Sequence, residues 1–420
     1  MAEEKKGGVS VYISPDIVKA LKERHQQNVK AGIAAGLDPL AMVEPSTGWQ
    51  VRAYLRAALG MNQVHGGGIM TVKAMALNTN QLFAYLNRED IAEFKFSPLF
   101  TTLFFPNVAT FSTQNIMLDT LDIEEVTMSA FCSPMVGSQV QRDKGYETST
   151  IKPGYMKPKH EIDPTKTIMR MAGEDPAQLN DPTYRRMRLI TGNMRRQINA
   201  IKARVEWLAV NAVTTGKNII EGEGIERYEI DWKIPEKNII EQADGKKWSE
   251  QDKEIHDPIY DIELYADQAG CPANVMIMGA EVWRTLRSFK KFRELYDLSR
   301  GSESAAELAC KNLGEVVSFK GYLGDIALIV YSGKYADSDG REKYFLEPDL
   351  LVLGNTNNKG LVAYGAIMDQ DAVRTGATQN MYYPKNWIED GDPAIEYVQT
   401  HSAPQPVPAV IRKFVTVKIG

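Results

Sequence analysis

The side chains best suited to chemistry are scattered along this 420-residue chain. None of its five histidines stands at a short metal-binding spacing such as His-Glu-x-x-His; they are His25, His65, His160, His256 and His401. Asp369 and Asp371 could share a metal ion, but without a nearby histidine a solvated loop is the commoner explanation. The sequence therefore predicts no metal site.

Two glycine-containing segments have only part of a ligand-binding motif. Gly354–Gly360 lacks the Gly-Lys-Ser/Thr ending that places an amine and a hydroxyl on phosphate and metal. Gly222–Arg227 lacks the third glycine of a dinucleotide fingerprint, and no Gly-x-Ser-x-Gly elbow is present. Three dispersed cysteines, expected to be buried small side chains, form no disulfide or metal pattern; they are Cys132, Cys271 and Cys310. We expect neither a catalytic residue nor a cofactor.

Composition limits the class of protein further. A chain of this length exceeds one compact core, so two or more lobes or long extensions are expected. The net charge of -5 offers no general attraction to nucleic acid. The N-terminus lacks a secretory signal, and no uncharged apolar stretch is long enough to predict a membrane span.

Residues 1–74 resemble an appended segment. Ser14, Pro15 and Asp16 predict the start of a short helix, and a second one is expected from Trp49 to Leu59. The glycine run at 66–68 predicts a flexible joint. Such a segment could clasp neighbouring subunits, act as a built-in scaffold, or be removed during maturation.

A dense aromatic cluster follows. Five phenylalanines fall within twelve residues, Phe94, Phe96, Phe100, Phe104 and Phe105. Burial of a ring, at roughly 25 cal/mol per Å² over about 150 Å², contributes several kcal/mol. We interpret the cluster as a core anchor, because flanking basic residues that would favour a membrane-touching patch are missing.

Residues 126–170 are expected to be extended. A turn near Lys144 separates two limbs, and the return limb carries Pro153, Pro158 and Pro164. Proline lacks the backbone donor that a central strand needs. The pattern indicates a long arm that reaches over a neighbouring molecule.

The clearest element is a helix that begins at Asp181-Pro182 and ends at Gly216. One apolar stripe has helical spacing: Met187, Ile190, Met194, Ile198, Ile201, Val205, Leu208 and Ala212. The other face is basic and carries one acid, Glu206; its main bases are Arg185, Arg186, Arg188, Arg195 and Arg196. That face could be solvated, or could meet acidic neighbours or packaged nucleic acid.

Beyond residue 217, a polar hairpin-like region is followed by alternating helical and strand patterns, which predict an α+β fold. Expected helices are Asp257–Ala269, Glu281–Leu298 and Ser304–Leu313; expected strands are Val275–Met278, Ile326–Tyr331, Leu350–Leu353, Leu361–Ile367 and Phe414–Ile419.

Several long blocks resemble the lambda-type family of phage major capsid proteins (phage major capsid protein E). They include FKFSPLF (94–100), KPGYMKPKHEIDP (152–164), EDPAQLNDPTYRRMRLI (174–190) and LVLGNTNNKGLVAYGAI (351–367). The resemblance covers residues 75–420 and implies the Hong Kong 97-like fold. Its implied parts are an N-terminal arm at 75–125, an extended loop at 126–180, a peripheral domain with the spine helix at 181–255, an axial domain at 256–375, and a return to the peripheral domain at 376–420.

The resemblance implies a shell subunit that forms pentamers and hexamers and encloses double-stranded DNA without sequence specificity. Inter-subunit contacts would fall on the extended loop, at Arg142, Lys144, Gly145, Lys157 and Lys159. Scaffold, portal and decoration proteins would be partners, and the virion capsid, assembled in the bacterial cytoplasm, would be its location. An encapsulin-like compartment or a soluble enzyme would be the alternatives, but the first should lack these blocks and the second needs a site.

Overall fold

The computed structural model describes residues 82, 98–120, 147–169, 182–268, 270, 273–295, 316–337 and 339–420. These belong to the second of two compact units, Met1–Met75 and Ala76–Gly420. Several predictions fall outside the described residues: those for segment 1–74, for Phe94 and Phe96, for the three cysteines, for the helix Ser304–Leu313, and for Arg142, Lys144 and Gly145.

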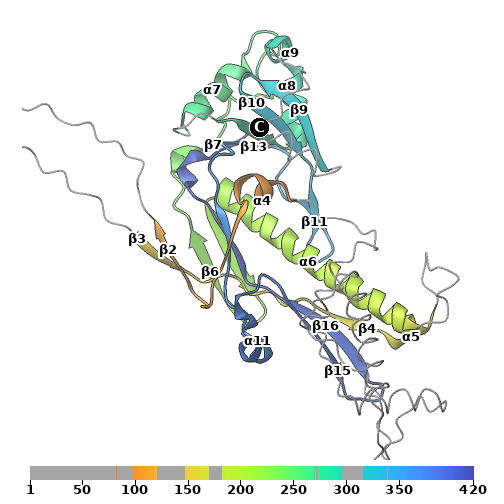
Figure 1. Ribbon diagram of the computed structural model, residues 1–420. Coiled ribbons are helices and arrows are strands. Elements are labelled where there is room, and N and C mark those ends of the chain that lie inside the picture. The colour runs from red at the N-terminus through yellow and green to blue at the C-terminus, as the bar shows by residue number, and fades with distance from the viewer. Residues whose placement is uncertain are drawn as a thin grey trace, which may run out of the picture. The chain divides into compact units, whose positions relative to one another are not determined.

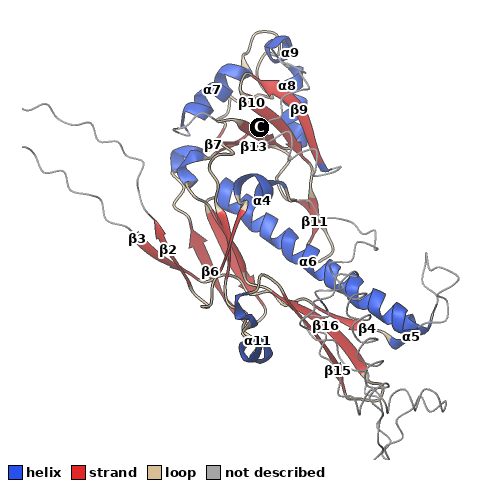
Figure 2. Ribbon diagram, in the orientation of Figure 1, coloured by secondary structure: helices blue, strands red, loops and turns tan. Residues whose placement is uncertain are grey.

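A six-stranded sheet forms the main core (Figures 1 and 2). Its order is β7 (Ile239–Glu241), β18 (Val415–Lys418), β13 (Leu350–Gly354), β8 (Val275–Met278), β10 (Ile326–Tyr331) and β9 (Val317–Leu323). Alternation along β8 turns Val275 and Ile277 toward one apolar cluster and Met276 and Met278 toward another. Both faces are therefore buried, which explains why the predicted strand is continuously apolar.

Three helices cover the Met276 face: α7 (Pro258–Gln268), α8 (Ala280–Ser288) and α9 (Lys290–Leu295). The prediction of one helix over Glu281–Leu298 was wrong. The chain is extended at Phe289, with φ -76° and ψ 133°, and the buried ring of Phe289 packs into the core between α8 and α9. Burial of that ring outweighs helix continuation.

The predicted long helix is confirmed as α6 (Pro182–Thr214), whose 33 residues span about 50 Å. Gly216, with φ +69°, follows its end. Most of the predicted stripe is buried, and Val205, Ala209 and Val213 pack in the same cluster as Val275 and Ile277. The second half of α6 thus supports the sheet face opposite α7, α8 and α9.

Smaller sheets surround this core. The order β15 (Tyr383–Glu389), β16 (Ile395–His401), β4 (Lys159–Ile162) forms one three-stranded sheet, and β1 (Asn107–Thr110), β14 (Leu361–Tyr364), β17 (Pro404–Val407) forms another. Three pairs stand alone: β2 (Ile116–Thr120) with β3 (Glu147–Ile151), β5 (Lys217–Gly222) with β6 (Ile225–Asp231), and β11 (Lys334–Ala336) with β12 (Glu342–Tyr344). Short helices are α4 (Leu99–Phe104), α5 (Pro164–Ile168) and α11 (Gln370–Thr375), with 3-10 turns at Glu236–Asn238, Ala377–Gln379 and Ile411–Lys413.

The arrangement corrects one expectation and leaves another as a prediction. The C-terminal strand β18 pairs with β13, in the segment predicted as axial, and with β7, in the segment predicted as peripheral, and Val415 and Val417 complete the apolar face under α7. The return limb was expected to lie over a neighbour, but β4 is an edge strand of its own chain, with Ile162 buried against α6. The edge position agrees with the proline argument.

Candidate assembly site

The aromatic anchor holds the segment before β1 in the main core. The described rings of the cluster are buried, with Phe100, Phe104 and Phe105 at most 2% exposed. The Phe104 ring meets Phe414 edge-on with centroids 4.9 Å apart. For these three residues the predicted core anchor is confirmed.

The N-terminus of α4 is capped from a distant part of the chain. Pro98 precedes the helix and offers no side-chain acceptor. The Glu206 carboxylate of α6 instead accepts from Phe100 N at 2.8 Å, Thr101 N at 2.9 Å and Thr101 Oγ1 at 2.7 Å. Burial raises the pKa of Glu206, although these hydrogen bonds oppose the shift. The carboxylate therefore joins the arm to the long helix.

The prediction that Glu206 lies on the basic face, away from the apolar stripe, was wrong. Its side chain is fully buried, next to the stripe residue Val205. The sequence did contain a signal for this burial, because Glu206 directly follows the stripe residue Val205 and lies within the largely apolar run Val205–Val210. A lone acid at the margin of a buried stripe must find donors, and here the free amides of α4 supply them.

The arginines predicted on the basic face of α6 differ in how far they are buried. Arg185 is buried and donates from Nη1 to the carbonyl of Ile168 at 2.8 Å. Arg186, Arg188 and Arg195 are partly buried, and Arg196 is the exposed one of the five arginines predicted on this face. The face is therefore not one uniform basic surface.

Arg186 forms a two-pronged ion pair with Glu396 of β16, with distances of 2.7 Å from Nε and 2.6 Å from Nη2. Asn386 of β15 donates to the same carboxylate at 2.8 Å. The side chains of Arg186 and Glu396 are 20% and 10% exposed, so water screens the pair little. This contact fixes the first half of α6 against the β4–β16–β15 sheet.

Gln197, about three turns further along α6, makes a second connection to that sheet. Its amide nitrogen donates to the carbonyl of Val398 at 2.8 Å and lies 2.9 Å from His160 Nδ1 on β4. Its oxygen accepts from Thr400 Oγ1 at 2.7 Å. We name the contact region of α6, β4, β16 and β15 the junction.

The two described lysines of the predicted inter-subunit set lie on the return limb. The Lys159 ammonium lies over the rings of Tyr397 and Trp387, 3.5 and 5.1 Å from their centroids. The carbonyl of Lys157 accepts from Gln399 Nε2 at 3.2 Å. In one chain, both residues hold the limb along β16, and an inter-subunit role for them stays a prediction.

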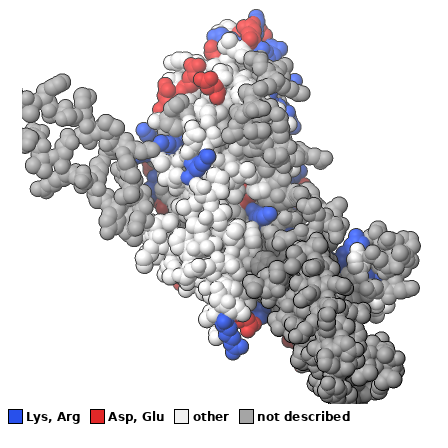
Figure 3. Space-filling model, viewed as in Figure 1, with Lys and Arg blue, Asp and Glu red and all other residues white. Residues whose placement is uncertain are grey.

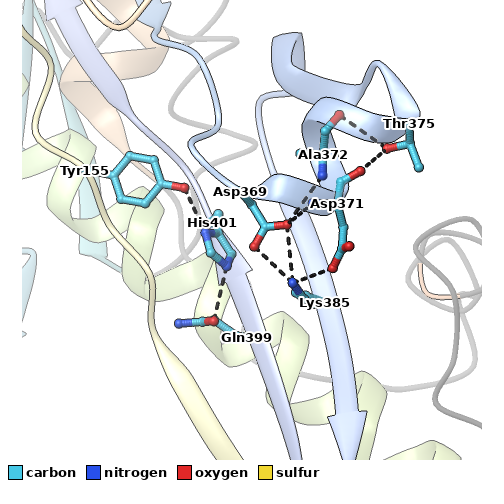
Figure 4. A network of polar contacts seen from close by, with 8 residues as sticks. All are labelled: Tyr155, Asp369, Asp371, Ala372, Thr375, Lys385, Gln399 and His401. Carbon is cyan, nitrogen blue, oxygen red and sulfur yellow. Dashed lines mark hydrogen bonds and ion pairs between the residues drawn. The ribbon is translucent and has the colours of Figure 1, made fainter.

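Beside the junction lies a polar network that resembles a catalytic arrangement (Figure 4). The Lys385 ammonium of β15 contacts Asp369 Oδ2 at 3.0 Å and Asp371 Oδ2 at 2.6 Å. Partial burial opposes the charge on Lys385, but the two carboxylates raise its pKa overall. Asp369 also caps α11. The two acids that could have shared a metal ion hold a lysine instead.

The other half of the network joins the return limb to β16. The Tyr155 hydroxyl lies 2.8 Å from His401 Nδ1, and His401 Nε2 lies 3.1 Å from Gln399 Oε1. Burial raises the pKa of Tyr155 to about 12 and lowers that of His401. Tyr155 is thus a weaker acid and His401 a weaker base than usual, so proton transfer between them is disfavoured and the two form a poor nucleophile and base pair. The geometry supports a structural role.

The described residues hold neither a metal cluster nor a membrane-spanning helix. No three His, Cys, Asp or Glu side chains among them are grouped as a metal site. No helix in the same part of the chain is long and apolar enough to cross a membrane.

Comparison with known proteins identifies the family. The model of the family described as phage major capsid protein E matches residues 78–419. The major capsid protein of Enterobacteria phage P21 is 45% identical over 341 residues, which is 81% of this chain and 98% of that protein. The chain belongs to the phage major capsid protein E family. The major capsid protein of Escherichia phage lambda is 43% identical over 328 residues, 78% of this chain and 96% of that one. A prophage protein of Escherichia coli CFT073, known from a crystal structure, is 97% identical to this chain in sequence. The two structures superpose with a TM-score of 0.72, and the match covers 82% of this chain and 100% of that one.

Membership in the phage major capsid protein E family confirms the α+β, Hong Kong 97-like fold expected from the sequence blocks. The chain is a major capsid protein of a tailed-phage head, a structural component of the virion and not an enzyme. It functions as a homo-oligomeric shell. The polar network beside the junction therefore belongs to a structural subunit, in agreement with the structural role that its geometry supports.

Proposed function

We propose that this major capsid protein assembles as pentamers and hexamers into a closed icosahedral head around double-stranded phage DNA. In that head, the part of the extended loop that precedes β4 lies on neighbouring copies. One observation carries the proposal: among the described residues, β2 and β3 at the base of this loop pair only with each other.

A two-stranded ladder is marginally stable alone, and both of its outer edges keep unpaired backbone groups. On β2, Met117 lies opposite Thr150 and is 70% exposed. Added strands from other molecules would satisfy such edges. At the other end of the limb, Ile168 and Met169 are 72% and 63% exposed, which offers a second apolar contact.

The remaining partners follow from family membership. Contact with DNA would be independent of sequence and weak, because the chain is acidic overall; the exposed bases of α6 are Arg196, Lys202 and Arg204. Scaffold, portal and decoration proteins would bind the shell. Arg142, Lys144, Gly145, Lys157 and Lys159 are the proposed loop contacts.

Replacement of loop residues 142–148 by a two-residue turn tests the proposal. The variant should give a soluble, folded subunit without closed shells, as seen by circular dichroism and negative-stain electron microscopy. The matched control is Glu223→Asn in the exposed β5–β6 turn, which should assemble like the wild type. Closed particles from the shortened loop would contradict the proposal.

A further inference from the structure

The lobe built on the six-stranded sheet has helices at two different ends. α7 contacts β13 and β18, whereas α8 contacts β10. In the strand order, β18 lies on the β7 side of the sheet and β10 lies next to the opposite edge, β9. The outer faces of α7 and α8 therefore belong to opposite ends of the lobe.

The outer face of α7 is acidic and partly apolar. Tyr260, Glu263, Leu264 and Asp267 have the spacing of one helix face and all are exposed, Tyr260 by 61% and Leu264 by 45%. Neither Glu263 nor Asp267 has an ion-pair partner among the described residues. Figure 3 shows acidic side chains gathered at this end of the lobe. We call these four residues the acidic stripe.

The opposite end is basic. Arg284 and Arg287 of α8 are exposed, and the side chain of neither forms an ion pair with a described residue. On the neighbouring edge strand β9, the Lys320 ammonium lies 5.8 Å from the ring centroid of Trp283. The lysines of α9 differ, because Lys290 and Lys291 pair with Glu254 and Asp257 of the same chain. α8 thus carries two exposed arginines against one exposed acid, Glu281, and we call this the basic end.

We propose that the acidic stripe of one copy binds the basic end of the next copy, and that this head-to-tail contact closes the rings of subunits in the shell. The inference deepens the proposed function and rests on it. Both complementary surfaces are on one chain at opposite ends, which is the condition for a heterologous contact that forms a ring. A two-fold contact through either surface would set like charges opposite each other, which disfavours it.

The two apolar side chains of the acidic stripe favour its contact with another protein surface over exposure to solvent. Tyr260 and Leu264 would lose water on contact, and aromatic side chains are enriched where interfaces form. Arginine binds carboxylates with two parallel hydrogen bonds, so Arg284 and Arg287 suit Glu263 and Asp267. The occupant is thus a second copy of this chain.

A charge-reversal experiment on the full chain tests the contact. The variants are Glu263→Lys/Asp267→Lys, Arg284→Glu/Arg287→Glu, and all four changes together. Each pair alone should reduce the oligomer fraction in sedimentation velocity at least about tenfold, which corresponds to roughly 1.4 kcal/mol. The fourfold variant should recover rings and shells, because the charges are again complementary.

The control reverses two exposed acids elsewhere, Glu223→Lys/Glu226→Lys, and should assemble like the wild type. Thermal melting checks that every variant folds, as expected for exposed positions. The proposal is overturned if either reversed pair assembles like the control, or if the folded fourfold variant stays monomeric. A wild-type chain that never forms oligomers would instead overturn the proposed function, and this interface with it.

Discussion

The six-stranded lobe and the junction are held together by different kinds of contact. In the lobe, apolar side chains fill both faces of the sheet, from Val275 and Ile277 on one side to Met276 and Met278 on the other. The junction has a small apolar cluster, and its distant segments are joined by polar contacts such as Arg186–Glu396 and Gln197–Thr400. Apolar packing tolerates changes in pH, whereas hydrogen-bonded titratable groups depend on it.

The difference fits the demands on a shell subunit. A chain that fills both pentameric and hexameric positions, as we propose for this one, needs rigid bodies joined by parts that can adjust. A core packed on both faces resists deformation. Directional polar contacts have a few discrete arrangements. We therefore expect the conformation of the junction, rather than that of the lobe, to differ between positions in the shell.

The largest expected effect lies in the lobe. Ile277→Ala removes a fully buried side chain from a central strand and should lower the free energy of unfolding by about 4 kcal/mol. Urea denaturation of the soluble subunit measures it, with Ile168→Ala, at a 72% exposed position, as a control near zero. Similar losses from both variants would show that the lobe is not the main source of stability.

A smaller effect is expected from the polar contacts of the junction. Arg186→Met leaves Glu396 with Asn386 as its remaining partner, and should lower the free energy of unfolding by about 3 kcal/mol. The double variant Arg186→Met/Glu396→Leu removes both charges and should lie within about 1 kcal/mol of the wild type.

The matched control for that pair is Lys217→Met. Lys217 and Glu229 are also 2.7 Å apart, but their side chains are 52% and 44% exposed, so the loss should stay below about 1 kcal/mol. Equal losses for Lys217→Met and Arg186→Met would mean that burial adds nothing to the junction pair.

The smallest expected effect is the response to pH. Burial lowers the pKa of His401, and burial with the nearby Arg196 charge lowers that of His160. Between the lowered value and the ordinary value near 6.5, the unfolded chain binds more protons than the folded one. The contribution of these histidines is therefore complete above about pH 6.5 and is lost as the pH falls below it.

Thermal melting should thus show a lower midpoint at about pH 5.5 than at about pH 7.5. In this window the Asp369 carboxylate keeps its charge, because hydrogen bonds from Lys385 hold its pKa below the ordinary value despite partial burial. The double variant His160→Gln/His401→Gln should flatten the response. An unchanged slope in that variant would place the pH dependence elsewhere.

Local patterns predicted the elements with strong periodicity. The N-terminal proline and apolar spacing of α6, and the short apolar runs of β8, β10 and β13, gave elements close to those observed. Strand order could not be predicted, because β18 inserts between β7 and β13 through contacts far apart in the chain. Contacts between side chains that are far apart in the sequence could not be predicted either. Glu206 lies 105 residues from Thr101, and Gln197 lies 203 residues from Thr400, so no local pattern links them.

Hydrogen–deuterium exchange on the subunit before and after shell assembly tests the account most directly. We expect amides of β8 and β13 to keep the same strong protection in both states, and amides of β4 and β16 to change as the junction adjusts and copies come into contact. Unchanged exchange in β4 and β16, together with altered exchange in β8 and β13, would contradict a rigid lobe joined to an adjustable junction.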